Sequence, residues 1–243
     1  MLGAVILSAV AACDLFRPGC GPWLEVPGDP ETSSSVPRVR GVPGQRLVDQ
    51  VPPGEGDIEV VFHSEAPFIA NFGTADEEIA SLVARAEAIV VAEAVRIESS
   101  LTPTEDGIES VVDLVVSEVL MSGEGLAAVI EGQHLQVRVN GGTLLVGGRR
   151  LTTRRNGEVV PRVGAAYLFP LFVTPATFVP PDRLVQEPAL VPLSPFQAFE
   201  IRENGLRRLW RHPEMCDALA AAEPASALQQ FRAEIRRQKG PRR

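Results

Sequence analysis

Residues 74–98 read TADEEIASLVARAEAIVVAEAVRIE, a helix start followed directly by a strand pattern. Thr74 and Glu77 have the spacing of a capping box, in which the Thr hydroxyl accepts a hydrogen bond from a first-turn N–H and the Glu reaches back to the cap. Ile79 and Leu82 begin an apolar stripe at helical spacing, and after residue 88 the pattern becomes β-type. The segment therefore predicts a short helix that runs straight into a strand.

The residues that follow predict more strands. The candidates are Ala88–Glu98, Ile108–Met121, His134–Val139, a hairpin built on Asn156-Gly157, and Ala165–Val173. In the first of them, Val95 shares the apolar, inward face with Ile89, Val91 and Ile97. Glycine-bearing turns separate them, such as Asp106-Gly107 and Asn140-Gly141-Gly142. Short antiparallel strands after one helix are typical of a mainly β fold, here a small closed or half-closed barrel.

This layout resembles a known kind of domain. The strings LVARAEAIVVAEAV (82–95), DLVVSEVLMSG (113–123) and VGAAYLFPL (163–171) are similar to OB-fold-type or netrin-like barrels of uncharacterised bacterial envelope proteins. The resemblance covers roughly residues 75–173 and consists of hydrophobic patterns, so it implies a fold and not an activity. Some netrin-like barrels are protease inhibitors that act through an N-terminal Cys, a mechanism that we do not transfer to any residue here.

The N-terminal residues indicate export. Residues 1–12 (MLGAVILSAVAA) have about the length of a signal-peptide apolar core and are too few to span a bilayer. The sequence Val10-Ala11-Ala12-Cys13 resembles a bacterial lipobox, which implies that Cys13 becomes the lipidated first residue. The alternative is an apolar N-terminal strand or helix with a buried Cys.

Composition divides the chain into four predicted parts. Residues 1–20 form the signal and lipobox segment, and residues 21–56, rich in Pro and Gly, form a tether. Residues 57–174 form the β-barrel domain. Residues 175–243 form a Pro-rich strap, a hairpin on Asn204-Gly205 and a C-terminal helix, all packed on the barrel.

The remaining thiols suggest one bridge. If Cys13 carries lipid, only Cys20 and Cys216 are left. An oxidising compartment favours their pairing into a disulfide that would join the base of the tether to the C-terminal segment. Alternatively, Cys216 is buried as a small apolar residue.

Catalytic and metal-binding patterns are not found in the sequence. His63, His134 and His212 lie in unrelated contexts, so we expect no metal and no cofactor. Glu93 and Asp113 could form an acid–base pair if their strands are neighbours, although solvated carboxylates are the simpler interpretation. The net charge of −8 argues against a nucleic-acid-binding protein.

Clustered arginines give the best candidate for a binding surface. Arg149, Arg150, Arg154 and Arg155 could face one way across the predicted Asn156-Gly157 hairpin, and guanidinium groups suit carboxylate and phosphate partners. A second basic group contains Arg207, Arg208, Trp210 and Arg211. A solvated, partly ion-paired surface is the competing interpretation, and contact with anionic lipid is the next.

The sequence thus predicts a non-catalytic envelope lipoprotein, anchored to a membrane and acting as an interaction module. Its partner would be an unknown protein or an anionic envelope surface. The alternative is an inhibitor or a hydrolase whose site is built from loops and leaves no linear motif.

Overall fold

The computed structural model describes residues 36–54, 56–62, 72, 74–155, 159, 161–174, 189–192, 198–209, 219 and 222–240. Within these ranges the fold is mainly β, as the sequence predicts. The strands are β1 (Arg38–Gly41), β2 (Ile58–Phe62), β3 (Ala88–Leu101), β4 (Ile108–Met121), β5 (His134–Asn140), β6 (Gly142–Val146), β7 (Arg149–Arg155), β8 (Ala166–Thr174), β9 (Ala189–Pro192), β10 (Phe199–Arg202) and β11 (Gly205–Arg208). The helices are α1 (Leu47–Gln50), α2 (Ala75–Arg85) and α3 (Pro224–Lys239), and Gly125–Ala127 forms a 3₁₀ turn, η1.

The larger sheet is antiparallel. Its strands lie in the order β11-β10-β8-β3-β4-β5, and β9 pairs with the far end of β8. The two long strands β3 and β4, of 14 residues each, form the hairpin on which the sheet is built. Alternate residues of these strands face opposite sides, so the sheet contributes to two separate apolar clusters.

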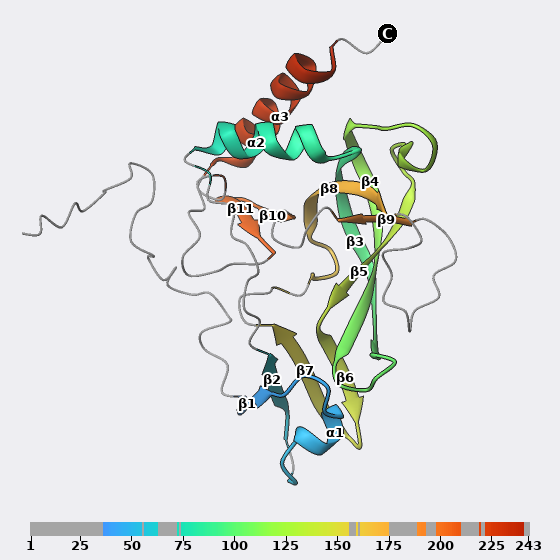
Figure 1. The fold of residues 1–243 in the computed structure, drawn as a ribbon. Helices are drawn as coiled ribbons and strands as arrows, with labels where there is room; N and C mark the ends of the chain where they lie inside the picture. Colours follow the sequence, from blue (N-terminus) through green and yellow to red (C-terminus); the bar gives the residue numbers. More distant parts are fainter. Residues whose placement is uncertain are drawn as a thin grey trace, which may run out of the picture.

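Helices α2 and α3 cover one face of this sheet (Figure 1). Ile79 and Leu82 of α2, and Phe231 of α3, pack with Ile89 of β3 in one cluster. The Thr74 hydroxyl accepts a hydrogen bond from the Glu77 N–H at 3.2 Å, which confirms the predicted helix start. The local sequence therefore determines where α2 begins, and burial of its apolar stripe determines where it packs.

The smaller sheet has the order β1-β2-β7-β6 and lies at the opposite end of the molecule from α3 (Figure 1). Strands β1 and β2, and β2 and β7, run parallel, whereas β6 and β7 form an antiparallel hairpin. Its inner face packs Ile58, Val60 and Leu151 with Leu47 of α1 and Ile108 of β4. The tip of the long β3–β4 hairpin thus contributes to the core of the second sheet.

A glycine pair connects the two sheets. Strand β5 ends at Asn140 in the larger sheet, and β6 begins at Gly142 in the smaller one. Gly142 has φ +149°, and a Cβ there would lie 2.2 Å from the Ser110 Oγ and 2.6 Å from the Ser99 Oγ. Only glycine fits at this crossing, because both the backbone angle and the close approach exclude a side chain.

Several expectations change in detail. Residues 38–50, predicted as part of a tether, form β1 and α1, because β1 pairs with β2 and Leu47 is fully buried. The hairpin turn of the arginine region is Gly147-Gly148, and Arg155 still belongs to β7. The Asn156-Gly157 dipeptide lies outside the described residues.

Other differences follow from strand register. Val95, predicted to face inward, is 42% exposed because the register of β3 against β4 shifts between Ala94 and Arg96. The C-terminal hairpin is confirmed, with its two-residue turn at Glu203-Asn204, one position before the predicted one. No ladder among the described strands closes either sheet into a barrel.

Candidate functional site

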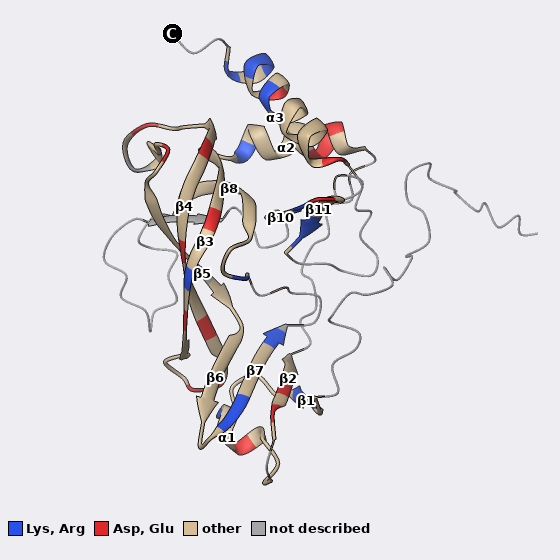
Figure 2. Ribbon diagram, turned by 180° about the vertical axis from the view of Figure 1, so that it is seen from behind, with Lys and Arg blue, Asp and Glu red and all other residues tan. Residues whose placement is uncertain are grey.

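The outer face of the smaller sheet carries an arginine cluster built from strands far apart in the sequence. Residues alternate between the two sides of each strand, so the neighbours of buried Val60 and Leu151 point outward. The face presents Arg38 and Arg40 from β1, Glu59 from β2, and Arg150 and Arg154 from β7. Figure 2 shows these basic strand positions on either side of the acidic position of β2. We call this surface the arginine face.

Glu59 holds two of these arginines in place. Its carboxylate accepts from the Arg38 Nε at 2.6 Å and from the Arg154 Nε at 2.5 Å. The Glu59 side chain is only 12% exposed, whereas that of Arg38 is 45% exposed. Asp57, just before β2, adds a second carboxylate, which accepts from the Arg150 backbone N–H at 3.3 Å. Four guanidinium groups against two carboxylates leave the arginine face locally basic.

Strand alternation divides the four arginines predicted from the sequence. Arg150 and Arg154 point outward, and Arg149 belongs to the opposite side, where its guanidinium donates to the Gly56 and Pro52 carbonyls at 2.9 Å each. Arg155 lies at the end of β7, and its side chain is outside the described part of the structure. The expectation that all four could face one way is therefore wrong, because adjacent strand residues point to opposite faces.

The sequence did not reveal Arg38 and Arg40 as partners of this group. They lie in the Pro/Gly-rich stretch, more than 100 positions before Arg150, and the parallel pairing of β1 with β2 brings them alongside β7. An alternating Arg-Val-Arg-Gly before a turn was the only local signal.

An exposed leucine borders the same face. Leu145 of β6 is 76% exposed and lies directly opposite Arg150 in the β6–β7 ladder. Next along the hairpin, the hydroxyls of Thr143 and Thr152 are 2.9 Å apart. The tip of the β6–β7 hairpin therefore combines a large aliphatic side chain with a guanidinium group.

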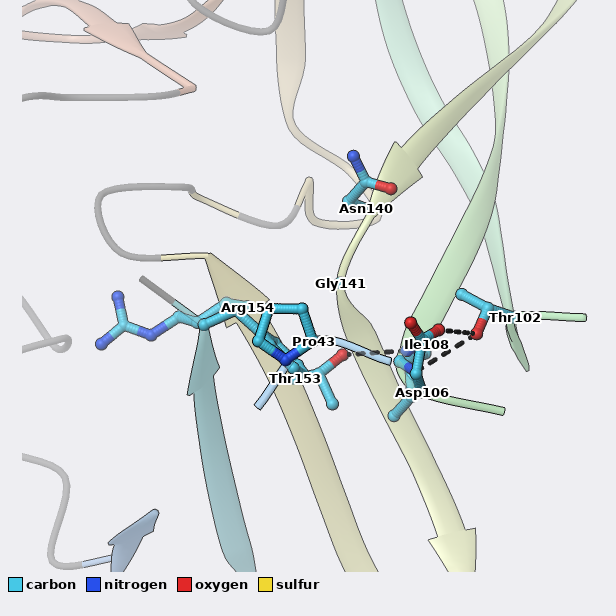
Figure 3. Close-up of a pocket in the computed structure, with 10 residues that line it drawn as sticks. Pro43, Thr102, Asp106, Ile108, Asn140, Gly141, Thr153 and Arg154 are labelled. Atoms are coloured by element: carbon cyan, nitrogen blue, oxygen red, sulfur yellow. Dashed lines mark hydrogen bonds between the residues drawn. The ribbon is translucent and has the colours of Figure 1, made fainter. Parts of the chain in front are cut away.

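A pocket of about 320 Å³ lies behind this hairpin, where the two sheets meet (Figure 3). It is lined by Pro43, Phe62, Thr102, Asp106, Gly107, Ile108, Asn140, Gly141, Thr153 and Arg154. The Arg154 guanidinium extends away from Asp106 (Figure 3) and bonds to Glu59, so the two charges do not converge in the pocket. The Thr153 hydroxyl accepts from the Ile108 N–H at 3.2 Å.

Asp106 is used to hold its own loop. Its carboxylate accepts from the hydroxyls of Thr104 and Thr102 at 2.6 and 2.8 Å and from the Gly44 N–H at 3.2 Å. The hydrogen bond from Thr104 lowers the pKa of the Asp106 carboxyl, and the bonds from Thr102 and Gly44 act in the same direction. Desolvation acts in the opposite direction and is outweighed. The group stays ionised and joins the β3–β4 loop to the segment after β1.

Two members of the second predicted basic group, Arg207 and Arg208, lie in the protein interior. Arg208 is 1% exposed and donates to both oxygens of Glu78 on α2, at 2.8 and 3.0 Å, while its guanidinium lies 4.7 Å from the centre of the Phe199 ring. Arg207 is 6% exposed. Trp210 and Arg211 lie outside the described residues. Arg207 and Arg208 thus stabilise the β10–β11 hairpin and offer little surface for a partner.

Glu200 forms the other buried ionic cluster. It is 1% exposed, is bonded by Arg162, and accepts from the Arg202 Nε at 3.0 Å. Burial alone would raise the pKa of Glu200, but the bonds from Arg162 and Arg202 outweigh it and hold the pKa below its usual value. Burial raises the pKa of neighbouring Tyr167, whose hydroxyl accepts from the Arg162 N–H at 2.6 Å.

The carboxylates considered for acid–base chemistry have structural or solvated surroundings. Glu93 is exposed on β3, opposite Val115. Asp113 accepts from the Gln136 amide at 2.8 Å, a cross-strand bond to β5. His134 is exposed on β5, as predicted. Among the described residues, no three His, Cys, Asp or Glu side chains are grouped so that they could hold a metal ion.

Other predicted site residues cannot be placed. Cys13, Cys20, Cys216, His63 and His212 lie outside the described residues. None of the helices in the described ranges is long and apolar enough to cross a membrane.

Comparison with known proteins finds no matching family model and no matching curated protein.

Proposed function

We propose that this protein is a non-catalytic interaction module of the cell envelope, attached to a membrane through lipid on Cys13. Its contact surface is the arginine face, and its partner is anionic. The observation that carries the proposal is the gathering of four arginines from β1 and β7 around Glu59 and Asp57, in a chain whose net charge is −8. A locally basic face on an acidic molecule selects where an anionic partner can approach.

The side chains on this face favour binding over catalysis. Catalysis needs an activated nucleophile, a positioned acid and base, or a metal. The arginine face offers guanidinium groups, which are permanently charged and suit carboxylate and phosphate groups. Arg40 and Arg150 are both exposed, so their guanidinium groups are open to a partner.

The finer fold assignment belongs to the same proposal. A half-closed, OB-like barrel is supported by β9, which pairs with β8 and also lies close to β5 at the other edge of the larger sheet. The five strands β3, β4, β5, β8 and β9 would then enclose the second apolar cluster, with α2 and α3 outside it.

Capture from native envelopes tests the function. Tagged wild type should recover an anionic component, and the double variant Arg40→Gln/Arg150→Gln should lose it. Among the described residues neither side chain forms an ion pair, and both are exposed, so folding should be unaffected. The matched control is Arg236→Gln/Lys239→Gln, which removes two charges from exposed positions on α3. Equal recovery by all three proteins would contradict the proposal.

A further inference from the structure

The arginine face and the adjacent hairpin tip combine two properties that suit a particular anionic partner. Arg40 and Arg150 carry exposed positive charge, and Leu145 presents an exposed aliphatic side chain next to Arg150. A protein partner of acidic character would need only the charges. A bilayer of anionic phospholipid uses both, because phosphate groups attract the arginines while the adjoining acyl boundary accepts the leucine.

The position of this face in the chain points the same way. Strand β1 is the first described element after Cys13, and the 24 residues 14–37 separate Cys13 from Arg38. A chain of that length spans at most about 90 Å when fully extended. A lipid on Cys13 would therefore limit the distance between Arg38 and the membrane surface to about 90 Å.

The overall charge makes the orientation selective. With a net charge of −8, most of the molecule is repelled by an anionic surface. In the part of the chain that the structure describes, a second basic region is the end of α3, which lies at the opposite end of the molecule from the smaller sheet (Figure 1). There Arg237 is paired with Glu234, and Arg232 is paired with Glu118. Leu145 borders the arginine face, whereas the described residues of α3 include no exposed large aliphatic side chain.

We infer that the arginine face docks on an anionic phospholipid surface, with Arg40 and Arg150 on the phosphate groups and Leu145 inserted at the acyl boundary. This inference rests on the proposed binding function. It orients the smaller sheet toward the membrane and directs α2 and α3 away from it.

Vesicle binding tests the inference. The full chain carrying Cys13→Ala, which has no acyl anchor, is mixed with phosphatidylcholine vesicles with and without phosphatidylglycerol at low ionic strength. The protein should bind only the phosphatidylglycerol vesicles. Each arginine near such a surface contributes roughly 1 kcal/mol, so Arg40→Gln/Arg150→Gln should weaken the partition coefficient by about 25-fold. The α3 control Arg236→Gln/Lys239→Gln should bind like the parent chain.

A second pair of variants examines the leucine. Leu145→Ser should weaken binding several-fold, whereas Val163→Ser, at another exposed aliphatic position of 61% exposure, should not. Amide hydrogen exchange of the parent chain on the vesicles provides a readout independent of mutation, since protection should rise at residues 142–150 and not along α3.

The outcomes separate the two proposals. Loss of vesicle binding in the Arg40→Gln/Arg150→Gln variant, together with new protection at residues 142–150, supports docking on lipid. Absence of binding to any vesicle, combined with arginine-dependent capture of an acidic envelope protein, overturns the lipid inference and leaves the proposed function in place. Greater loss in the α3 variant than in the arginine-face variant also overturns it.

Discussion

Arg208 and Glu78 form a salt bridge in the interior, although they are 130 positions apart in the sequence. Both side chains are 1% exposed, and Phe199 covers the guanidinium. Desolvating two charges costs about as much as their attraction gains, so such a pair adds little net stability but becomes costly when broken. The pair connects α2 to β11 and thereby fixes how the helix lies on the sheet.

Breaking this pair should destabilise the fold strongly. Replacement Glu78→Ala leaves the Arg208 charge without its two carboxylate bonds, and we expect a loss of about 3–5 kcal/mol in the free energy of unfolding. The exposed pair Arg232–Glu118 is the control, and Arg232→Ala should cost less than about 1 kcal/mol. Urea unfolding followed by circular dichroism measures both. Similar losses for the two variants would show that the buried pair is not linked to α2 packing.

Glu200 should make stability depend on pH on the acid side. Its pKa in the folded protein lies below the ordinary value of 4.5. A lowered folded pKa contributes stability that is complete above the unfolded value and is lost as pH falls through the folded value. The difference in unfolding free energy between wild type and Glu200→Gln should therefore be largest above about pH 5.

The measurement is a urea midpoint for both proteins at a series of pH values. As pH falls below 4.5, the wild type should lose its advantage over Glu200→Gln, because protonation removes the charge that Arg162 and Arg202 bind. A difference that stays constant from neutral to acidic pH would show that the carboxylate charge contributes nothing there.

The joint between β5 and β6 depends on one glycine. Gly142→Ala would place a Cβ 2.2 Å from the Ser110 Oγ, which is held by a bond to the Gly141 carbonyl at 2.7 Å. We expect a loss of roughly 3 kcal/mol or more from backbone strain and overpacking together. Gly147→Ala, at φ +58° with nothing within 4 Å, should cost only about 1–2 kcal/mol. Chemical unfolding of the two variants compares them directly, and equal losses would exclude a special role for Gly142.

The elements that the sequence predicts well are those whose signals are local. The capping hydroxyl of Thr74 and the apolar stripe of α2 lie within a dozen residues. Strands β3, β4, β5 and β8 follow their alternating patterns closely. The β10–β11 hairpin formed at its turn dipeptide, shifted by one position.

The elements that the sequence does not predict depend on pairing partners far away in the chain. Strand β1 is stable because it pairs in parallel with β2 and because Leu47 fills the inner core, and neither effect is visible in a Pro/Gly-rich stretch. The same long-range pairing brings Arg38 and Arg40 to the candidate site. Periodicity alone would have separated Arg149 from Arg150, since neighbours on a strand face opposite sides.

At the scale of the whole molecule, the two ends differ in character. One end is formed by the small sheet with its arginine face and exposed Leu145, and the other by α2 and α3. The first described strand and the hairpin tip both belong to the small-sheet end. An anchor attached through the N-terminal segment would act on that end, so tethering and docking would reinforce each other by raising the effective concentration of the face at the membrane.

The last prediction concerns the anchor itself. Cys13 follows Val10-Ala11-Ala12, and the thiol should form a thioether to diacylglycerol before cleavage of the segment in front of it. Each buried CH₂ of the acyl chains contributes about 0.8 kcal/mol to membrane binding. Summed over whole acyl chains, this binding free energy is far larger than that of the arginines. In its own host, wild type should therefore partition with membranes through a high-salt wash, and Cys13→Ala should be released.

A high-salt wash distinguishes membrane attachment through the lipid anchor from membrane binding through the arginine face. Screening weakens contacts between guanidinium groups and phosphates but leaves acyl insertion intact. The variant Arg40→Gln/Arg150→Gln should thus remain with membranes as long as Cys13 is present, and mass spectrometry of the N-terminal peptide should show the acyl mass. If wild type and Cys13→Ala partition equally with membranes in high salt, and the N-terminal peptide carries no acyl mass, lipidation is excluded. The arginine face would then bind its partner without a lipid anchor.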